Sequence, residues 1–388
     1  MKNLSADNST YDGLRFDVIT EDLETGARAG LLHTPRGSIE TPVFMPVGTQ
    51  ATVKTVTQQN LVEIGAQILL ANAYHLYLRP GHKLISRAGG LHKFMNWAGP
   101  ILTDSGGYQV FSLTELTKIS EEGVRFQSHL DGSYHLFSPE KVMEIEHSLG
   151  ADIIMAFDEC TPYPSTKEYA AESMERTLRW TERCLKHHES LTNTNTTPSP
   201  ALFGIVQGSM FEDLRRSCAH RLRDLDLPGY ALGGLGVGEP TAEMDAVVSA
   251  ITPDLPASKP RYLMGVGLPR DIITSVSAGI DMFDCVIPTR NARNGTLFAS
   301  HGRVRIKNRR YAEDFEPVDI DCVCATCRNY HRAYLRHLFQ TKEILGLHLA
   351  TVHNLHFFRN MMASMRRAII GGVFDVWKRE FFATYQDS

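Results

Sequence analysis

Eight short apolar segments recur along the chain, and most of them are separated by amphipathic helical patterns such as 172–188 and 210–225. The apolar segments cover residues 43–47, 67–71, 101–103, 153–157, 202–206, 230–234, 262–265 and 282–286. Each segment is a continuous run, which is typical of parallel strands that are covered on both faces. Eight strand–helix units over about 240 residues predict an α/β fold of the (β/α)8 TIM-barrel type, whose usual length is about 250 residues. The alternative is an open doubly wound sheet, but no G-x-G-x-x-G motif opens a helix here.

Other patterns flank and interrupt the predicted barrel. Residues 16–44 read as short strands broken by Gly and Pro, which predicts an antiparallel preface. Residues 124–137 predict an inserted hairpin that turns at Asp131-Gly132, and 192–199 form a polar low-complexity loop. Helical patterns at 329–345 and 354–370 predict a C-terminal subdomain. We therefore expect a disordered tail at 1–13, the barrel with its preface and insertions at 14–296, and a subdomain packed on the barrel at 297–388.

The composition narrows the class of protein. The chain has 388 residues, and 43% of them are hydrophobic, which suffices for a large buried core. No run of about eighteen apolar residues occurs, so we expect no membrane span. The N-terminal residues are polar and lack the apolar centre of a signal peptide. Seven cysteines are an odd number, which favours a reducing compartment over a disulfide framework. These features predict a cytoplasmic protein.

A basic stretch follows the eighth predicted strand. The net charge of the chain is −4, yet residues 286–312 hold no Asp or Glu. Their basic residues are Arg290, Arg293, Arg303, Arg305, Lys307, Arg309 and Arg310. A carboxylate at a strand end, Asp284, beside a surface suited to polyanions indicates chemistry on a nucleic acid. The alternative is a solvated basic face beside a structural Asp.

Polar residues and glycines follow most of the predicted strands. In a barrel these strand ends meet at the C-terminal face, where active sites lie. The segments are Asp104-Ser105-Gly106-Gly107, Asp158-Glu159-Cys160, Gln207-Gly208, Gly234-Leu235-Gly236, Gly265-Val266-Gly267 and Asp284. A single Asp here could be a helix N-cap or a loop acid. Together the acids, the Gln and the glycines can hold the edge of a purine-like base. Two acids with separate duties also suit substitution at the anomeric carbon of a sugar.

A second cluster of ligand-type residues lies in the C-terminal part. Cys322, Cys324 and Cys327 fall within six residues, and His353 can complete a tetrahedral set for a structural zinc ion. His348 is a second candidate, but at helical spacing only one of the two histidines should bind. The alternative is a group of free cysteines.

These residues together resemble the bacterial queuine tRNA-ribosyltransferase family, the tRNA-guanine transglycosylases. The resemblance runs from about residue 16 to residue 382 and rests on segments 102–110, 155–160, 233–235 and 281–286 and on the Cys/His set. It implies a barrel with one structural Zn2+ per chain and no redox cofactor. It also implies a homodimer that exchanges the wobble guanine of GU(N) anticodons, in the tRNAs for Asp, Asn, His and Tyr, for a deazaguanine base.

The resemblance assigns roles to individual residues. Asp284 would attack ribose C1′, and Asp104 would be the general acid and base. Asp158, Gln207 and Gly234 would hold the base edge, and Tyr108 and Met264 would sandwich its faces. Arg290 and Arg293 would contact the anticodon loop, and Arg303 and Arg305 belong to the same basic run. The chain departs from the family pattern at two positions: Ala73 replaces a common Thr, and Gly236 replaces Ala or Ser.

The identity of the inserted base depends on the pocket wall. Val237 and Cys160 stand where the queuine-using type has a small residue and a Val, so Val237 would fill the space of queuine's cyclopentenediol. The carbonyl of Leu235 could accept a proton from the compact, cationic aminomethyl group of 7-aminomethyl-7-deazaguanine. We therefore expect the aminomethyl base as substrate in queuosine biosynthesis. The alternatives are a queuine-inserting enzyme, a barrel glycosidase, and a non-catalytic zinc- and RNA-binding accessory subunit.

Overall fold

The computed structural model describes residues 13–113, 117–193 and 199–386. The predicted tail therefore lies outside the described residues except for Gly13, as do positions 194–198 of the polar loop. Within the described ranges, no helix combines the length and apolarity needed to cross a membrane.

Eight parallel strands form a closed barrel, as the apolar segments predicted. The strands are β4 (Val43–Pro46), β5 (Leu69–Asn72), β6 (Ile101–Asp104), β10 (Ile153–Met155), β11 (Ala201–Val206), β12 (Gly229–Leu232), β13 (Arg261–Leu263) and β14 (Met282–Cys285). They pair in the order β4-β14-β13-β12-β11-β10-β6-β5. A parallel bridge between Val47 and Leu70 joins the two ends, and the Gly48 N–H donates to the Leu70 carbonyl at 2.6 Å. The open doubly wound alternative is therefore wrong.

The strands are apolar on both faces because two core layers cover them. Val43 and Met45 point into the barrel interior with Tyr262 and Met282, whereas Phe44 points into the layer beneath the helices. Burial on both faces explains the continuous apolar runs. The surrounding helices are α1 (Gln58–Ile64), α2 (Ala73–Leu78), α3 (His82–Arg87), α4 (Leu91–Met95), α5 (Gly107–Leu113), α6 (Pro139–Leu149), α7 (Lys167–Thr192), α8 (Glu212–Arg223), α9 (Thr241–Ile251), α10 (Pro269–Ser277) and α11 (Ile287–Asn294), with a short 3-10 turn η1 at Thr252–Asp254.

The antiparallel preface closes the N-terminal end of the barrel. It contains β1 (Arg15–Glu21), β2 (Arg28–Thr34) and β3 (Gly37–Thr41). The buried guanidinium of Arg28 donates to both carboxylate oxygens of Asp281, at 2.9 and 2.6 Å, just before β14 begins. The predicted hairpin is also present as β8 (Val124–Gln127) and β9 (Tyr134–Phe137), and a third strand, β7 (Thr117–Ile119), pairs with β8.

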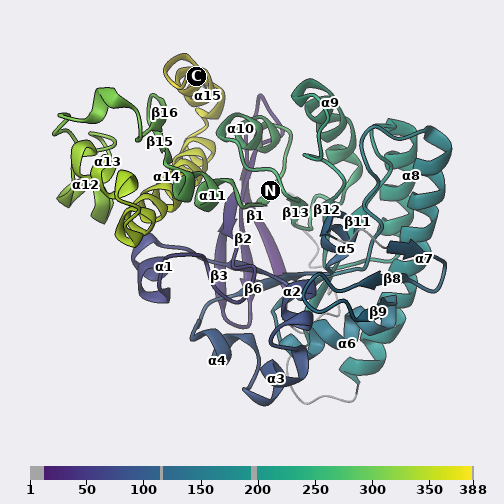
Figure 1. The fold of residues 1–388 in the computed structure, drawn as a ribbon. Coiled ribbons are helices and arrows are strands. Elements are labelled where there is room, and N and C mark those ends of the chain that lie inside the picture. Colours follow the sequence, from purple (N-terminus) through teal and green to yellow (C-terminus); the bar gives the residue numbers. More distant parts are fainter. Residues whose placement is uncertain (1–12, 114–116, 194–198, 387–388) are drawn as a thin grey trace.

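The C-terminal part packs beside the barrel, on the side of β4 (Figure 1). It contains β15 (Thr296–Ala299), β16 (Gly302–Arg305), the 3-10 turn η2 (Arg309–Tyr311), α12 (Ala325–Asn329), α13 (Arg332–Gln340), α14 (Ile344–Ile370) and α15 (Phe374–Thr384). The predicted helix boundaries at 329, 345 and 354 were wrong, whereas the second helix ends at Ile370 as predicted. The first helical pattern is interrupted after Asn329 and again near Lys342, whose φ is +58°. Asn354 does not begin a helix: its side chain accepts from the Phe298 N–H and donates to the Pro288 carbonyl, deep inside α14.

Candidate active site and metal centre

The polar residues predicted at the strand ends converge on the C-terminal rim of the barrel. Asp104 is the last residue of β6, and Asp284 lies in β14 near its C-terminal end. Asp158 follows β10, and Gln207 directly follows β11. Parallel strands bring these ends to one face, so the barrel itself assembles the set.

Asp104 is a buried carboxyl that is held by three donors. The side chain of Asn72 donates to Oδ2, Gln109 Nε2 donates to the same oxygen at 2.8 Å, and the Ala73 N–H donates to Oδ1 at 3.2 Å. Burial raises the pKa of Asp104 to about 7; these hydrogen bonds oppose the rise, and the nearby charge of Asp284 adds to it. The Asp104 carboxyl can therefore gain or lose a proton near neutral pH. Ala73, the first departure from the family pattern, supports this carboxyl through its backbone.

Asp284 has a different set of partners. Its Oδ1 accepts from the Tyr262 hydroxyl at 2.6 Å and from the Gly265 N–H at 2.8 Å. Burial raises the pKa of this carboxyl, but both hydrogen bonds favour its ionised form. The side chain remains partly exposed, so one face of it can meet a ligand. Carboxyls in unlike environments are suited to unlike duties.

Asp158 and Gln207 are buried polar residues that lie at the C-terminal rim, beside Gly107 and Gly234. Gln207 Nε2 donates to Asp158 Oδ2 at 2.7 Å, and burial raises the pKa of Asp158 to about 6. Gln207 Oε1 is buried without a partner among the described residues. A Cβ at Gly107 would lie 2.6 Å from Asp158 Oδ1, and one at Gly234, where φ is +63°, would lie 2.5 Å from Gln207 Oε1. A side chain at either position would therefore clash with these polar groups, so both positions require glycine.

The loop after β12 is oriented by Glu239, which the sequence reading missed. The Glu239 carboxylate accepts from the Gly236 N–H and from the Val237 N–H, the latter at 2.9 Å. In a planar trans peptide, C=O and the following N–H point in opposite directions. The Leu235 carbonyl therefore points away from Glu239. A carboxylate two residues beyond Val237, in a Gly-rich turn, is the signal that could have indicated this role.

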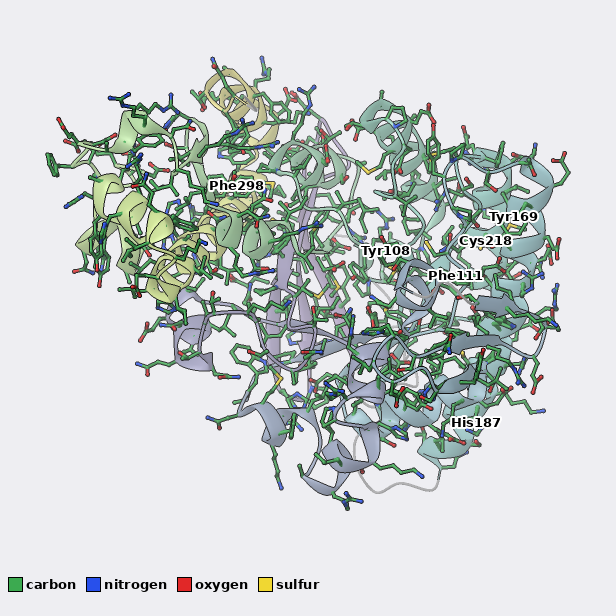
Figure 2. All side chains as sticks on the ribbon, viewed as in Figure 1. Tyr108, Phe111, Tyr169, His187, Cys218 and Phe298 are labelled. Atoms are coloured by element: carbon green, nitrogen blue, oxygen red, sulfur yellow. The ribbon has the colours of Figure 1, made fainter. Side chains whose placement is uncertain are left out.

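The remaining predicted pocket residues lie around this rim. Tyr108 is on α5 and is 53% exposed, and Figure 2 shows it near the middle of the view. Met264, Cys160 and Val237 are half-buried, whereas Leu235 is buried. Burial raises the pKa of the Cys160 thiol to about 12, so it is a neutral group at physiological pH. The stacking of Tyr108 and Met264 on a base stays a prediction.

The predicted basic residues fall on two elements. Arg290 and Arg293 lie on α11, directly after β14. Arg290 is exposed, and the Nη1 atom of Arg293 is buried without a partner among the described residues. Arg303 and Arg305 lie two residues apart on β16 and therefore share one face of that strand.

The Cys/His set is brought together as predicted. The ligand atoms of Cys322, Cys324, Cys327 and His353 all lie within 4.8 Å of one another. The distances from His353 Nδ1 to the three sulfurs are 3.7, 3.6 and 3.3 Å, in chain order. A tetrahedral zinc ion would separate a nitrogen and a sulfur ligand by about 3.6 Å, given its usual bond lengths. His353 Nε2 lies 2.7 Å from the Phe298 carbonyl, to which it can donate, leaving Nδ1 free for a metal.

The competing histidine has a different contact. His348 Nδ1 lies 2.8 Å from the Thr55 carbonyl and is not in the cluster, which agrees with the expectation that only one histidine binds. His356, which the sequence reading did not consider, lies 3.5 Å from Cys322 Sγ through its Nδ1.

The fold and this site define a (β/α)8-barrel protein with a two-carboxyl centre and a separate Cys3His cluster. The family model described as queuine tRNA-ribosyltransferase matches residues 22–387. A queuine tRNA-ribosyltransferase from Caldanaerobacter subterraneus subsp. tengcongensis is 58% identical over 372 residues, 96% of this chain and 98% of that protein. One from Lysinibacillus sphaericus is 54% identical over 376 residues, 97% of each chain. The chain belongs to the queuine tRNA-ribosyltransferase family.

Proposed function

We propose that this chain exchanges the wobble guanine of GU(N) anticodons for 7-aminomethyl-7-deazaguanine, by double displacement through a covalent ribosyl-aspartate. The observation that carries the proposal is the pair of unlike carboxyls on one barrel rim, Asp104 and Asp284, beside the hydrogen-bonded pair Asp158 and Gln207. The tRNAs for Asp, Asn, His and Tyr would be its substrates. Both acids are present, which argues against a non-catalytic accessory subunit.

In the first step, Asp284 attacks ribose C1′ and the bond from C1′ to the guanine nitrogen breaks. The electron pair of that bond leaves with guanine, which takes a proton from Asp104. In the second step, the incoming base gives its proton to Asp104 and its nitrogen attacks C1′, releasing the Asp284 carboxylate. The pKa of about 7 supports Asp104 in both roles, because a group that titrates near the working pH can give and take a proton.

Base recognition would use the pair Asp158 and Gln207 and the β12 loop. The Asp158 carboxylate can accept from ring N–H and amino groups, while Gln207 and Gly234 donate to the base carbonyl. The Leu235 carbonyl, turned away from Glu239, is free to accept from the aminomethyl ammonium group. Tyr108 and Met264 would cover the two faces of the ring.

The pocket wall supports the aminomethyl base over queuine. The Val237 N–H donates to Glu239, which helps to hold this part of the β12 loop in place. Val237 with Cys160 would then leave little room for the cyclopentenediol, and an overpacked site typically costs about 1–3 kcal/mol. A queuine-inserting enzyme is the alternative that this wall argues against.

The Cys/His cluster would hold one structural Zn2+ through Cys322, Cys324, Cys327 and His353. When bound, the ion supplies folding free energy and no step of the exchange. Its four protein ligands leave no open position, which supports a structural role.

The other expectations concern partners and place. Arg290, Arg293, Arg303 and Arg305 would bind tRNA phosphates, since they share a basic run that follows β14 in the sequence. The resemblance implies a homodimer. Light scattering tests this, because a measured mass equal to that of one chain would contradict a dimer. A tRNA substrate and free thiols support a cytoplasmic protein.

Exchange of labelled guanine into unmodified tRNA with a GUN anticodon tests the proposal. The wild-type protein should incorporate label and form a covalent adduct with tRNA on denaturing gels. Asp284→Asn should keep tRNA binding and form no adduct, whereas Asp213→Asn, a surface change on α8, should behave as wild type. No incorporation by metal-replete wild-type protein, or an adduct in Asp284→Asn, would contradict the proposed mechanism.

A further inference from the structure

Arg215 of α8 is a fully buried cation whose described hydrogen bonds all go to backbone carbonyls. Nε donates to the Ser209 carbonyl at 2.5 Å, and Nη1 donates to that of Val206 at 3.2 Å. Nη2 donates to the Gly233 carbonyl at 2.9 Å and to that of Gly234 at 3.4 Å. Burial lowers the pKa of Arg215 only to about 10, so the group is charged at neutral pH. One guanidinium therefore ties the loop after β11 to the loop after β12.

The hydrogen bonds of Arg215 fix the direction of two backbone N–H donors. Because the Gly233 and Gly234 carbonyls turn toward Arg215, the N–H groups of Gly234 and Leu235 point away from it. Neither N–H donates to any acceptor among the described residues. The unpartnered Oε1 of Gln207 lies beside Gly234. Backbone N–H groups that have no acceptor in the protein are available to donate to an acceptor on a ligand.

The backbone at Gly208 packs closely against Arg215. Gly208 has φ of +139°, and a Cβ there would lie 2.8 Å from the backbone nitrogen of Arg215 and 2.9 Å from the Cγ of its side chain. Lysine could not replace the guanidinium, because a single ammonium lacks the planar fork that reaches carbonyls on two loops. The geometry of the donors, and not the positive charge alone, is what the site uses.

We propose that Arg215 is a positioning residue that sets base specificity: by holding the Gly233 and Gly234 carbonyls, it aims the Gly234 and Leu235 N–H groups at the carbonyl of the bound base. The inference rests on the proposed function, since that base is the substrate. Arg215 itself touches no substrate. It acts through the peptide that it orients.

Arg215→Lys separates this role from a purely structural one. The probes are guanine and 6-thioguanine, which keeps the ring N–H and amino group but offers sulfur, a poor acceptor, in place of the carbonyl oxygen. In Arg215→Lys the KM for guanine should rise about tenfold or more, and that for 6-thioguanine by less than about threefold, because the affected donors serve the oxygen. The affinity for tRNA and the metal content should stay unchanged. Arg216→Lys, one residue on, is the matched control and should change neither KM: Arg216 is half-buried and pairs with Glu212 and Asp254 instead of the two loops.

Three outcomes decide the matter. If wild-type protein exchanges guanine and Arg215→Lys keeps the wild-type ratio of the two KM values, the Arg215 proposal fails alone. If wild-type protein exchanges no guanine, the proposed function fails instead. Should Arg215→Lys not fold, amide hydrogen exchange of wild-type residues 233–236 replaces it: guanine should slow the Gly234 and Leu235 amides. Amides that are already slow without guanine, or that guanine leaves unprotected, overturn the proposal.

Discussion

Asp104→Asn should remove a pH dependence of stability that comes from one carboxyl. In the folded protein burial raises the pKa of Asp104 from its ordinary value of 3.8 to about 7. Between these values the folded state keeps a proton that the unfolded state has released. Stability therefore falls as the pH rises through this window, and the loss is complete above the folded pKa. Asn cannot titrate, so the variant should lack this loss.

The size of the effect follows from the shift. Each pH unit inside the window costs about 1.4 kcal/mol of unfolding free energy, because one more proton is bound to the folded state. Integrated from pH 5.5 to pH 8.0 with a folded pKa of about 7, the wild type should lose about 2 kcal/mol relative to Asp104→Asn. Only the change of the difference with pH is compared. The hydrogen bonds that Asn makes or loses contribute a free energy that does not depend on pH, so their contribution cancels.

Urea unfolding of metal-replete protein across that pH range measures the difference. Asp213→Asn is the control: Asp213 is exposed beside Lys167, whose hydrogen bond lowers the pKa of Asp213, so its contribution should be flat above pH 5.5. A wild-type minus Asp104→Asn difference that stays flat would refute a neutral acid at position 104. A lowered pKa would place the titration of Asp104 below pH 3.8, so it too would give a flat difference in this range.

Four further outcomes are expected. Cys324→Ala should lower the zinc content from one ion per chain, measured by metal analysis, and weaken tRNA binding because structural zinc contributes to folding; wild-type protein without stoichiometric zinc would contradict this. Neutralising Arg303 with Arg305 should flatten the salt dependence of tRNA affinity by roughly one unit for each phosphate that the variant no longer neutralises, and an unchanged slope would move the RNA footprint elsewhere. In competition between the bases, the wild type should incorporate queuine poorly, and Val237→Ala should increase queuine incorporation. Equal incorporation of queuine and the aminomethyl base by the wild type would contradict the argument that Val237 excludes the cyclopentenediol. Burial raises the pKa of Glu146 well above 4.5, so the stability of the wild type relative to Glu146→Gln should fall as the pH rises above 4.5, and a difference that does not change with pH would contradict this.

The sequence predicted the barrel because strands buried on both faces leave continuous apolar runs, and it predicted Asp104 and Asp284 because strand ends meet on one rim. It could not predict groups whose role depends on contacts between distant segments. Arg215 lies in an amphipathic helix and reads as one more surface cation, yet the fold buries it against two loops. Tyr262 reads as part of an apolar strand, but its hydroxyl holds Asp284. Helix boundaries failed for the same reason at Asn354, whose side chain bonds distant backbone groups.

The electrostatic link between the two carboxyls explains how Asp104 could change roles under the proposed mechanism. While Asp284 is ionised, its negative charge raises the pKa of Asp104 and so favours the protonated acid that guanine needs in order to leave. Formation of the ribosyl ester removes that charge. The pKa of Asp104 should then fall, which stabilises the carboxylate just when the incoming base must lose a proton. Adduct formation in a single turnover should accordingly slow as the pH rises through about 7, while release of the adduct by the new base should not. Rapid-quench measurement of both half-reactions against pH separates them, and parallel profiles would show that Asp104 does not serve as acid in one and base in the other.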